Sequence, residues 1–384
     1  MDIILFDTEE ARGNLLPLTY TRPVGCLRVG IDTIARKWQR FMQADVFFST
    51  DCYLSAKFPV YQGDDGFYVA SNVLPDEALA AAVAALEPGQ RLLAGDRLVA
   101  YRSGPIGESV SYTGDITAID KVYDIFLKNG EVLRADFKAL TAGKPFRTPS
   151  DTVTIIGDPS QLYIHPDAGD VEGCVINVRT GPVYIGAGAE VMEGACLRGP
   201  IALCHGSKIK MGAKIYEDTT IGPWCKVGGE VENSVFIGYS NKAHDGFLGN
   251  AVIGEWCNLG GGCVASNLKN DYTEIKLWNY PAHRFLRTGL QFCGLIMGDH
   301  SKVGVNAMLN TATTLGVGVN IHGSGFPRPF LASFLEGSTA GFTEVPMAKF
   351  FDTARRVMAR RGIDLTQDDI DILNHVRELA EQYR

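Results

Sequence analysis

Apolar residues recur at every sixth position through the middle of the chain. Between residues 185 and 227 the pattern has no exception, with Ile185, Val191, Leu197, Leu203, Ile209, Ile215, Ile221 and Val227. The fourth residue after each is mostly small, and glycine often follows the apolar residue directly. A period of six fits neither an α-helix nor a simple alternating strand. It is typical of hexapeptide repeats, in which short strands turn a corner every six residues and stack as coils of a parallel β-helix.

The repeat continues after a slip of two residues and then after a break. It resumes at Val235, Asn241, Phe247, Ile253, Leu259 and Ala265, and returns at Met297, Val303, Leu309, Leu315 and Ile321. The break at 269–294 carries aromatic and cationic side chains, and loops of this length are usually functional. We expect it to project and to cover a nucleotide-like cofactor or to pack on a neighbouring subunit.

The first 145 residues have a different pattern. Short apolar runs such as 2–6 and 45–50 alternate with helical stretches such as 30–42 and 75–86. This alternation predicts an α/β domain built on a largely parallel sheet. The stretch from Val122 to Ala142 reads equally as a helix or as a pair of strands.

Three segments follow from these patterns. We predict an α/β domain at 1–145, a β-helix at 152–330 and C-terminal helices at 345–384, with Lys144 to Asp151 as the linker. Thr366 and Asp369 have the spacing of a capping box at the start of the last helix.

Composition excludes several classes of function. The net charge of −8 does not suit a nucleic-acid-binding protein. The sequence has no run of eighteen apolar residues, so we expect no membrane span. The N-terminal residues do not suit a signal peptide. Nine cysteines with no CxxC pair indicate reduced thiols and a cytoplasmic protein.

The run Leu15 to Pro23, together with Arg12, resembles the signature of sugar-1-phosphate nucleotidyltransferases. The resemblance implies that Arg12, Arg22 and Arg28 bind the triphosphate of a nucleotide. It also implies that Asp96, in a Gly-Asp pair, binds Mg²⁺. Acidic residues at 7–10 replace the glycines of the family's phosphate loop. The alternatives are a solvated basic surface for the arginines and a plain turn for Asp96.

The stretch from Ser240 to Asn270, which contains His244, resembles the acetyltransferase domain of a family of two-domain enzymes. This is the bifunctional N-acetylglucosamine-1-phosphate uridylyltransferase/glucosamine-1-phosphate N-acetyltransferase family, whose β-helix is left-handed. The resemblance implies a homotrimer with acetyl-CoA between subunits and gives His244 the role of general base. Imidazole suits that role because the acceptor amine must lose a proton near neutral pH.

The same resemblance assigns the remaining residues of the site. Asn258 would bind the amino sugar, and the acetyl-CoA positions fall on Gly261, Asn267, Val305 and Gly323. The family's substrate tyrosine is replaced by Phe247, and its substrate cations have no clean counterpart, so Lys242 and Arg198 are the candidates. His300 is a second candidate base that we expect to be structural.

The leading hypothesis is an enzyme of nucleotide-sugar biosynthesis. It would couple a sugar-1-phosphate nucleotidyltransferase to an acetyl-CoA-dependent N-acetyltransferase acting on an amino sugar phosphate. One alternative is an acetyltransferase with a degenerate N-terminal domain. Another is a non-catalytic trimeric scaffold, which would give no reason for His244, Asn258 and Asn267 to cluster at the break.

Overall fold

The computed structural model describes residues 2–384. The chain divides into two compact units, of which the first contains the residues up to Leu27 and Asp32–Asp124. The second contains Arg28–Ile31 and Ile125–Arg384. The segment from Ile125 to residue 145, which we expected to end the α/β domain, therefore belongs with the β-helix.

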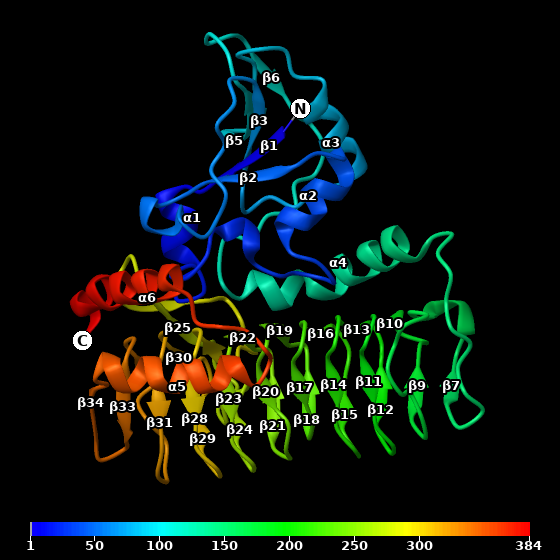
Figure 1. Cartoon of the computed structure of the whole chain (residues 1–384), viewed down its shortest axis with the longest axis vertical. Coiled ribbons are helices and arrows are strands. Elements are labelled where there is room, and N and C mark those ends of the chain that lie inside the picture. Colours follow the sequence, from blue (N-terminus) through cyan, green and yellow to red (C-terminus); the bar gives the residue numbers. More distant parts are fainter. Residues whose placement is uncertain (1) are drawn as a thin grey trace. The chain divides into compact units, whose positions relative to one another are not determined.

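A mixed sheet forms the centre of the first unit (Figure 1). In sheet order its strands are β2 (Val46–Ser49), β1 (Asp2–Phe6), β3 (Gly66–Ala70), β5 (Arg97–Arg102), β4 (Arg91–Ala94) and β6 (Ser109–Ser111). β1 pairs in parallel with β2 and β3, whereas β5 is antiparallel to both of its neighbours. Five of the six strands therefore run in the same direction, which agrees with the expected largely parallel sheet, and only β5 runs the other way. The turn Gly95-Asp96 joins β4 to β5 directly, and so short a connection permits only antiparallel pairing.

Short helices complete this unit. They are α1 (Glu9–Asn14), α2 (Ile34–Met42) and α3 (Glu77–Ala84), with 3-10 turns η1 (Val24–Cys26) and η2 (Cys52–Leu54). The side chains of Thr8, Thr33 and Asp76 accept a hydrogen bond from a backbone N–H of the first turn of each α-helix. These caps fix where the helices begin, because they satisfy donors that no helical carbonyl can reach.

Three parallel sheets form the faces of the β-helix (Figure 1). Sheet I contains β8 (Leu162–Ile164), β10 (Val183–Ile185), β13 (Ile201–Leu203), β16 (Thr219–Ile221), β19 (Val235–Gly238), β22 (Val252–Glu255), β27 (Ile296–Met297), β30 (Thr314–Leu315) and β32 (Phe330–Leu331). Sheet II contains β11 (Glu190–Val191), β14 (Lys208–Ile209), β17 (Lys226–Val227), β20 (Asn241–Lys242), β23 (Asn258–Leu259), β28 (Lys302–Val303), β31 (Asn320–Ile321), β33 (Leu335–Ser338) and the antiparallel edge strand β34 (Gly341–Glu344). Sheet III contains β7 (Thr154–Ile156), β9 (Val175–Asn177), β12 (Cys196–Arg198), β15 (Lys214–Ile215), β18 (Glu230–Glu232), β21 (Phe247–Gly249), β24 (Val264–Ala265) and β29 (Met308–Leu309). The parallel β-helix expected from the six-residue period is confirmed.

The interior of this β-helix corrects the predicted phase of the repeat between Val227 and Ile253, whereas the predicted positions from Ile253 onward are interior as expected. Ile221 pairs with Phe236, and Val227 pairs with Lys242. The interior positions are therefore Phe236, Lys242 and Leu248, one residue later than the sequence pattern suggested. The coils are shorter here than the eighteen residues of three full hexads, so a strict count of six loses its register.

The corner between sheets I and II has a left-handed residue in every coil from β10 onward. Glycine fills this corner at Gly188, Gly206 and Gly318, but Trp224, Tyr239, Trp256, His300 and Phe334 fill it with φ between 56° and 61°. A left-handed conformation costs a residue with a side chain roughly 1–2 kcal/mol. Stacking of Tyr239 on Trp256, with ring centroids 4.3 Å apart, offsets part of this cost.

The break in the repeat is a β-hairpin of β25 (Lys276–Asn279) and β26 (Arg284–Arg287). Trp278 stacks on Phe330 at 4.0 Å, and Tyr280 packs edge-on against Tyr383. Tyr280 is buried. The expected projecting loop thus contains a folded hairpin, and its Trp278 and Tyr280 pack on their own chain, whereas Tyr272, Phe285 and Phe292 are exposed.

Helices flank the coils of the second unit. They are α4 (Asp124–Thr141), α5 (Met347–Ala359) and α6 (Gln367–Ala380), with 3-10 turns η3 (Pro159–Gln161) and η4 (Glu381–Tyr383). The stretch from Val122 to Ala142 is therefore helical, and the capping box of Thr366 and Asp369 is confirmed. Within residues 2–384, no helix has the length and apolarity needed to cross a membrane.

Candidate functional site

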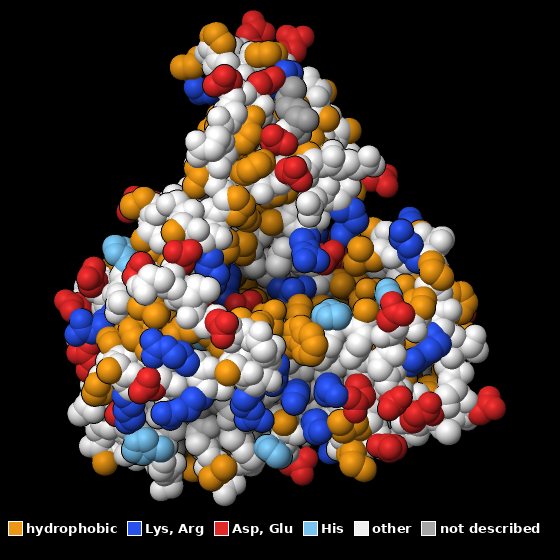
Figure 2. Space-filling model, viewed as in Figure 1, with side chains coloured by type: hydrophobic (Ala, Val, Ile, Leu, Met, Phe, Trp, Pro, Cys, Tyr) orange, Lys and Arg blue, Asp and Glu red, His pale blue; other side chains and the backbone are white. Residues whose placement is uncertain are grey.

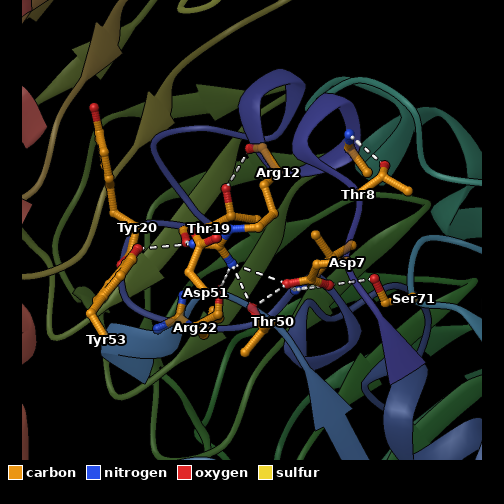
Figure 3. Close-up of polar contacts among 12 residues, drawn as sticks. Asp7, Thr8, Arg12, Thr19, Tyr20, Arg22, Thr50, Asp51, Tyr53 and Ser71 are labelled. Atoms are coloured by element: carbon orange, nitrogen blue, oxygen red, sulfur yellow. Dashed lines mark hydrogen bonds and ion pairs between the residues drawn. The ribbon is translucent and has the colours of Figure 1, made fainter. Parts of the chain in front are cut away.

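In the first unit, polar side chains meet where three parallel strands end (Figure 3). Asp7 follows β1, Thr50 follows β2 and Ser71 follows β3. The hydroxyl of Thr50 donates to one carboxylate oxygen of Asp7 at 2.6 Å, and the hydroxyl of Ser71 donates to the other at 2.5 Å. Ligands of open α/β sheets bind at this edge, beside the strand where the order reverses.

Arg12 closes the same edge from α1 (Figure 3). One terminal nitrogen lies 3.0 Å from Asp7, and the Nε nitrogen lies 2.7 Å from Asp51. The other terminal nitrogen donates to the carbonyl oxygen of Thr19 at 2.8 Å and to the hydroxyl of Tyr53 at 2.9 Å. Burial opposes the charge, but Tyr53, Asp7 and Asp51 outweigh it and raise the pKa of Arg12. Burial also raises the pKa of Tyr53, to about 12.

The arginines expected to bind a triphosphate have partners within the protein. The Arg12 guanidinium would have to exchange a protein carboxylate for a phosphate. Arg22 is buried, and its guanidinium reaches the carbonyl oxygen of Leu18 at 3.5 Å. Arg28, in the second unit, donates to the carbonyl oxygen of Ile237 at 3.1 Å.

Asp96 is exposed at the tip of the β4–β5 hairpin. In the described part of the chain, residues 2–384, no group of three or more His, Cys, Asp or Glu side chains is arranged to hold a metal ion. The exposed position at a hairpin tip fits the plain-turn alternative for Asp96.

In the second unit, His244 stands at the corner between sheets II and III. Three further predicted residues, Gly261, Val305 and Gly323, occupy equivalent positions in the next coils. On sheet II, Asn241 pairs with Asn258, Asn258 with Lys302 and Lys302 with Asn320. His244, Gly261, Val305 and Gly323 each come three residues after one of these four strand residues, so they lie at the same corner. We call this line of four residues the His244 edge.

The His244 edge is accessible. His244 and Gly323 are exposed, and Val305 keeps 70% of its surface exposed. A Cβ added to Gly261 would lie 3.5 Å from the Cβ of His244, so this glycine leaves room beside the imidazole. An exposed imidazole with open space along the coils can accept a proton from a bound amine.

Lys242 lies under this edge, inside the β-helix. It is 1% exposed, and its ammonium donates to the carbonyl oxygens of Gly228 at 2.9 Å and His244 at 2.7 Å. Burial lowers the pKa of Lys242 from 10.5 to about 8. The expected contact of Lys242 with a substrate phosphate is incompatible with this burial, and its ammonium instead holds the backbone at His244.

The remaining predicted residues lie at other places. Asn258 is exposed on sheet II, between Asn241 and Lys302 in the register. Asn267 is at the corner between sheets III and I, where its amide donates to Glu232 at 2.9 Å and to Asn250 at 2.8 Å.

Arg198 ends β12 on sheet III, and its Nε nitrogen lies 3.6 Å from Glu217. The structure therefore brings His244 together with Gly261, Val305 and Gly323, but not with Asn267 or Arg198.

His300 has a different environment from His244. It is buried at the corner between sheets I and II, near the rings of Trp256 and Phe350 at centroid distances of 6.3 and 5.7 Å. This enclosure agrees with the structural role expected for His300.

Two features of the second unit were missed from the sequence. A cavity of about 820 Å³ lies beside the hairpin and is lined by side chains that include Lys269, Lys276 and Phe285. Lysine and arginine side chains also gather on the outer face of sheet II (Figure 2). Lys208 and Lys226 are eighteen residues apart, which is the length of one coil. This spacing could have revealed that lysine side chains gather on one face of the β-helix.

Comparisons with known proteins cover parts of the chain. Residues 3–145 match the family model described as sugar nucleotidyl transferase. A comparison with curated proteins finds no match.

Among solved structures, similarity extends to a UDP-N-acetylglucosamine acyltransferase from Francisella novicida, with 14% identity and a TM-score of 0.29 over 61% of this chain and 75% of that chain. The Arabidopsis UDP-N-acetylglucosamine acyltransferase has 12% identity and a TM-score of 0.26 over 62% and 82% of the two chains. The N-acyltransferase AntD from Bacillus cereus, in complex with dTDP and 3-hydroxybutyryl-CoA, has 11% identity and a TM-score of 0.23 over 56% and 87%. Such TM-scores describe a partial overlap of the chains.

Proposed function

We propose that the protein is an acyltransferase that moves an acyl group from a coenzyme A thioester to the amine of a sugar. The observation that carries this proposal is the His244 edge. One exposed imidazole stands in line with three predicted cofactor positions, Gly261, Val305 and Gly323, over four consecutive coils. A cofactor lying along these coils would bring its thioester beside the imidazole.

His244 would take the proton of the amine as the amine attacks the thioester carbonyl. The new C–N bond forms as the C–S bond breaks, and the proton leaves through the imidazole to the departing thiolate. Asn258, exposed on the neighbouring strand β23, remains a candidate for binding the sugar.

The match of residues 3–145 to a sugar nucleotidyl transferase family supports a second candidate function in the first unit. Nucleotidyl transfer there would require a triphosphate to enter the edge that Asp7 and Arg12 now share. An anion already occupies the position next to the arginine, since Asp7 lies 3.0 Å from it. We therefore favour acyl transfer, with the first unit as a sugar-binding or degenerate domain.

The test is acyl transfer by the purified full-length protein with acetyl-CoA and a panel of amino sugar phosphates and nucleotide-linked amino sugars. His244→Ala should lower the rate roughly 10²–10⁴-fold, the usual contribution of a positioned acid or base. The affinity for acetyl-CoA should change little, because the imidazole acts mainly in the transition state. His300→Gln is the matched control and should stay active if it folds. Full activity of His244→Ala would refute the assignment.

A further inference from the structure

The outer face of sheet II carries a concentration of positive charge. Lys208 and Lys226 are neighbours in the register of β14 and β17, and Lys210 follows Lys208 by two residues. Arg360 and Arg361 come directly after α5. Figure 2 shows this gathering of Lys and Arg over β14 and β17, with acidic side chains gathered farther along, towards β11 and β12. We call these five residues the cation cluster.

The protein itself neutralises little of this charge. Lys208 pairs with Glu190. Among residues 2–384, no carboxylate pairs with the half-buried Lys210 and Lys226 or with Arg360. Burial lowers the pKa of Lys226, and the four other cations of the cluster lower it further. Holding such charges together without counter-charges is unfavourable unless an anion binds.

Arg361 connects the cluster to the coil that carries His244. One of its terminal nitrogens donates to the side-chain oxygen of Asn241 at 3.0 Å and to the carbonyl oxygen of Trp224 at 3.4 Å. Both partners are neutral. The Nε nitrogen of Arg361 is buried without a hydrogen-bond partner in the described chain. Across residues 2–384 no carboxylate pairs with this guanidinium, and burial lowers the pKa of Arg361.

The cluster lies within reach of the proposed reaction. Lys226 pairs with Asn241, and Asn241 precedes His244 by three residues. At about 3.3 Å per extended residue, the imidazole and the cluster are on the order of 10 Å apart along the same face. That distance exceeds a single sugar ring and suits a sugar with a diphosphate attached.

We propose that the cation cluster binds the phosphate groups of the acceptor, and that the acceptor is an amino sugar linked to a nucleoside diphosphate. This inference rests on the proposed acyl transfer, because it places the sugar amine at His244. Lys208 and Lys210 lie one coil from Lys226, and neighbouring coils are about 4.8 Å apart. Two adjacent phosphates can therefore contact cations of both coils. Coenzyme A also carries phosphates, so the two sources are separated by experiment.

The first experiment measures binding of inorganic pyrophosphate to the full-length protein by calorimetry at fixed ionic strength. The double variant Lys210→Gln/Lys226→Gln should bind at least tenfold more weakly, since one hydrogen bond to a charged group contributes roughly a factor of ten. Lys214→Gln removes an exposed lysine of sheet III and should bind as the wild type does. Equal affinity of the double variant and the wild type would overturn the proposal.

The second experiment identifies the source of the phosphates by competition. UDP should displace pyrophosphate at lower concentration than coenzyme A does. If coenzyme A or a short RNA displaces it more effectively, the assignment to a nucleotide-linked acceptor is wrong. His244→Ala keeps the cluster and should bind pyrophosphate normally. If the wild type transfers acyl groups but the double variant binds pyrophosphate as well as the wild type does, this inference fails and the proposed function stands. If the double variant loses pyrophosphate binding but the wild type transfers no acyl group, the proposed function fails and the cluster remains a phosphate-binding site.

Discussion

The buried ammonium of Lys242 makes the stability of the β-helix depend on pH. A charge inside the coils is unfavourable, and burial lowers the pKa of Lys242 from 10.5 to about 8. The folded protein then binds this proton less tightly than the unfolded chain does. The contribution of Lys242 to stability must therefore rise as the pH increases from about 8 towards 10.5, because the unfolded chain holds more of this proton in that window. Lys242→Met removes the charge and retains a long apolar side chain.

The size of the effect follows from the shift of the pKa. The lowered pKa of Lys242 costs the fold roughly 3 kcal/mol at pH 7, where the side chain is charged in both states, and roughly 1 kcal/mol at pH 10, where it is neutral in the fold. The difference in unfolding free energy between Lys242→Met and the wild type should therefore shrink by about 2–2.5 kcal/mol across this range. Loss of the two hydrogen bonds to the carbonyl oxygens of Gly228 and His244 changes the offset but not this slope.

Urea unfolding at pH 7, 8, 9 and 10, followed by tryptophan fluorescence, measures this difference. Other groups that titrate in this range are common to both proteins, so their effects cancel. The control Lys214→Met alters an exposed lysine and should follow the wild-type curve. A difference between Lys242→Met and the wild type that stays constant with pH would refute the reasoning, since it would mean that the ammonium is solvated.

Further predictions concern the rest of the chain. Arg12→Met should destabilise the first unit by roughly 3–5 kcal/mol, because it leaves Asp7 buried without its cation; an unchanged melting temperature in calorimetry would contradict this. If the first unit retains nucleotide binding, one of the nucleoside triphosphates with Mg²⁺ should raise its melting temperature, and no rise with any of them would favour a degenerate domain. Replacing residues 269–294 by a short Gly-Ser linker should lower the melting temperature of the second unit, because it removes the buried Tyr280 and the stacking of Trp278 on Phe330; a calorimetric melting temperature equal to that of the wild type would contradict this. The protein should be a homotrimer in light scattering at micromolar concentration, since flat solenoid faces are commonly covered by cyclic symmetry; a monomer mass would contradict that expectation.

The site was predictable only in part, and particular residues show why. The family resemblance assigns both His244 and Gly261 to the site, and the structure places them at one corner because Asn241 pairs with Asn258. Asn267 belongs to the same stretch of sequence, but it stands at a different corner and bonds to Glu232 and Asn250. The corner at which a residue lies depends on the lengths of the coils before it. A small error in the predicted register therefore assigns the residue to the wrong face of the β-helix.

The cation cluster could not be found by the repeat alone. Arg361 meets Asn241 across 120 positions of sequence, because α5 returns along the coils. Similarly, the sequence indicates Arg12 as a phosphate-binding candidate, but Asp51 and Tyr53, which contact its guanidinium, lie in the segment after β2. Such contacts depend on how separate elements dock.

The sequence by itself determined the β-helix, because each coil repeats the same local requirement for an apolar residue inside and a turn at the corner. That requirement is met within about eighteen residues, so it leaves a visible period. The tertiary structure decided which side chains face the interior, as Lys242 does, and which distant charges meet. Burial and charge pairing arise between segments far apart in the chain, and their energies leave no period in the sequence.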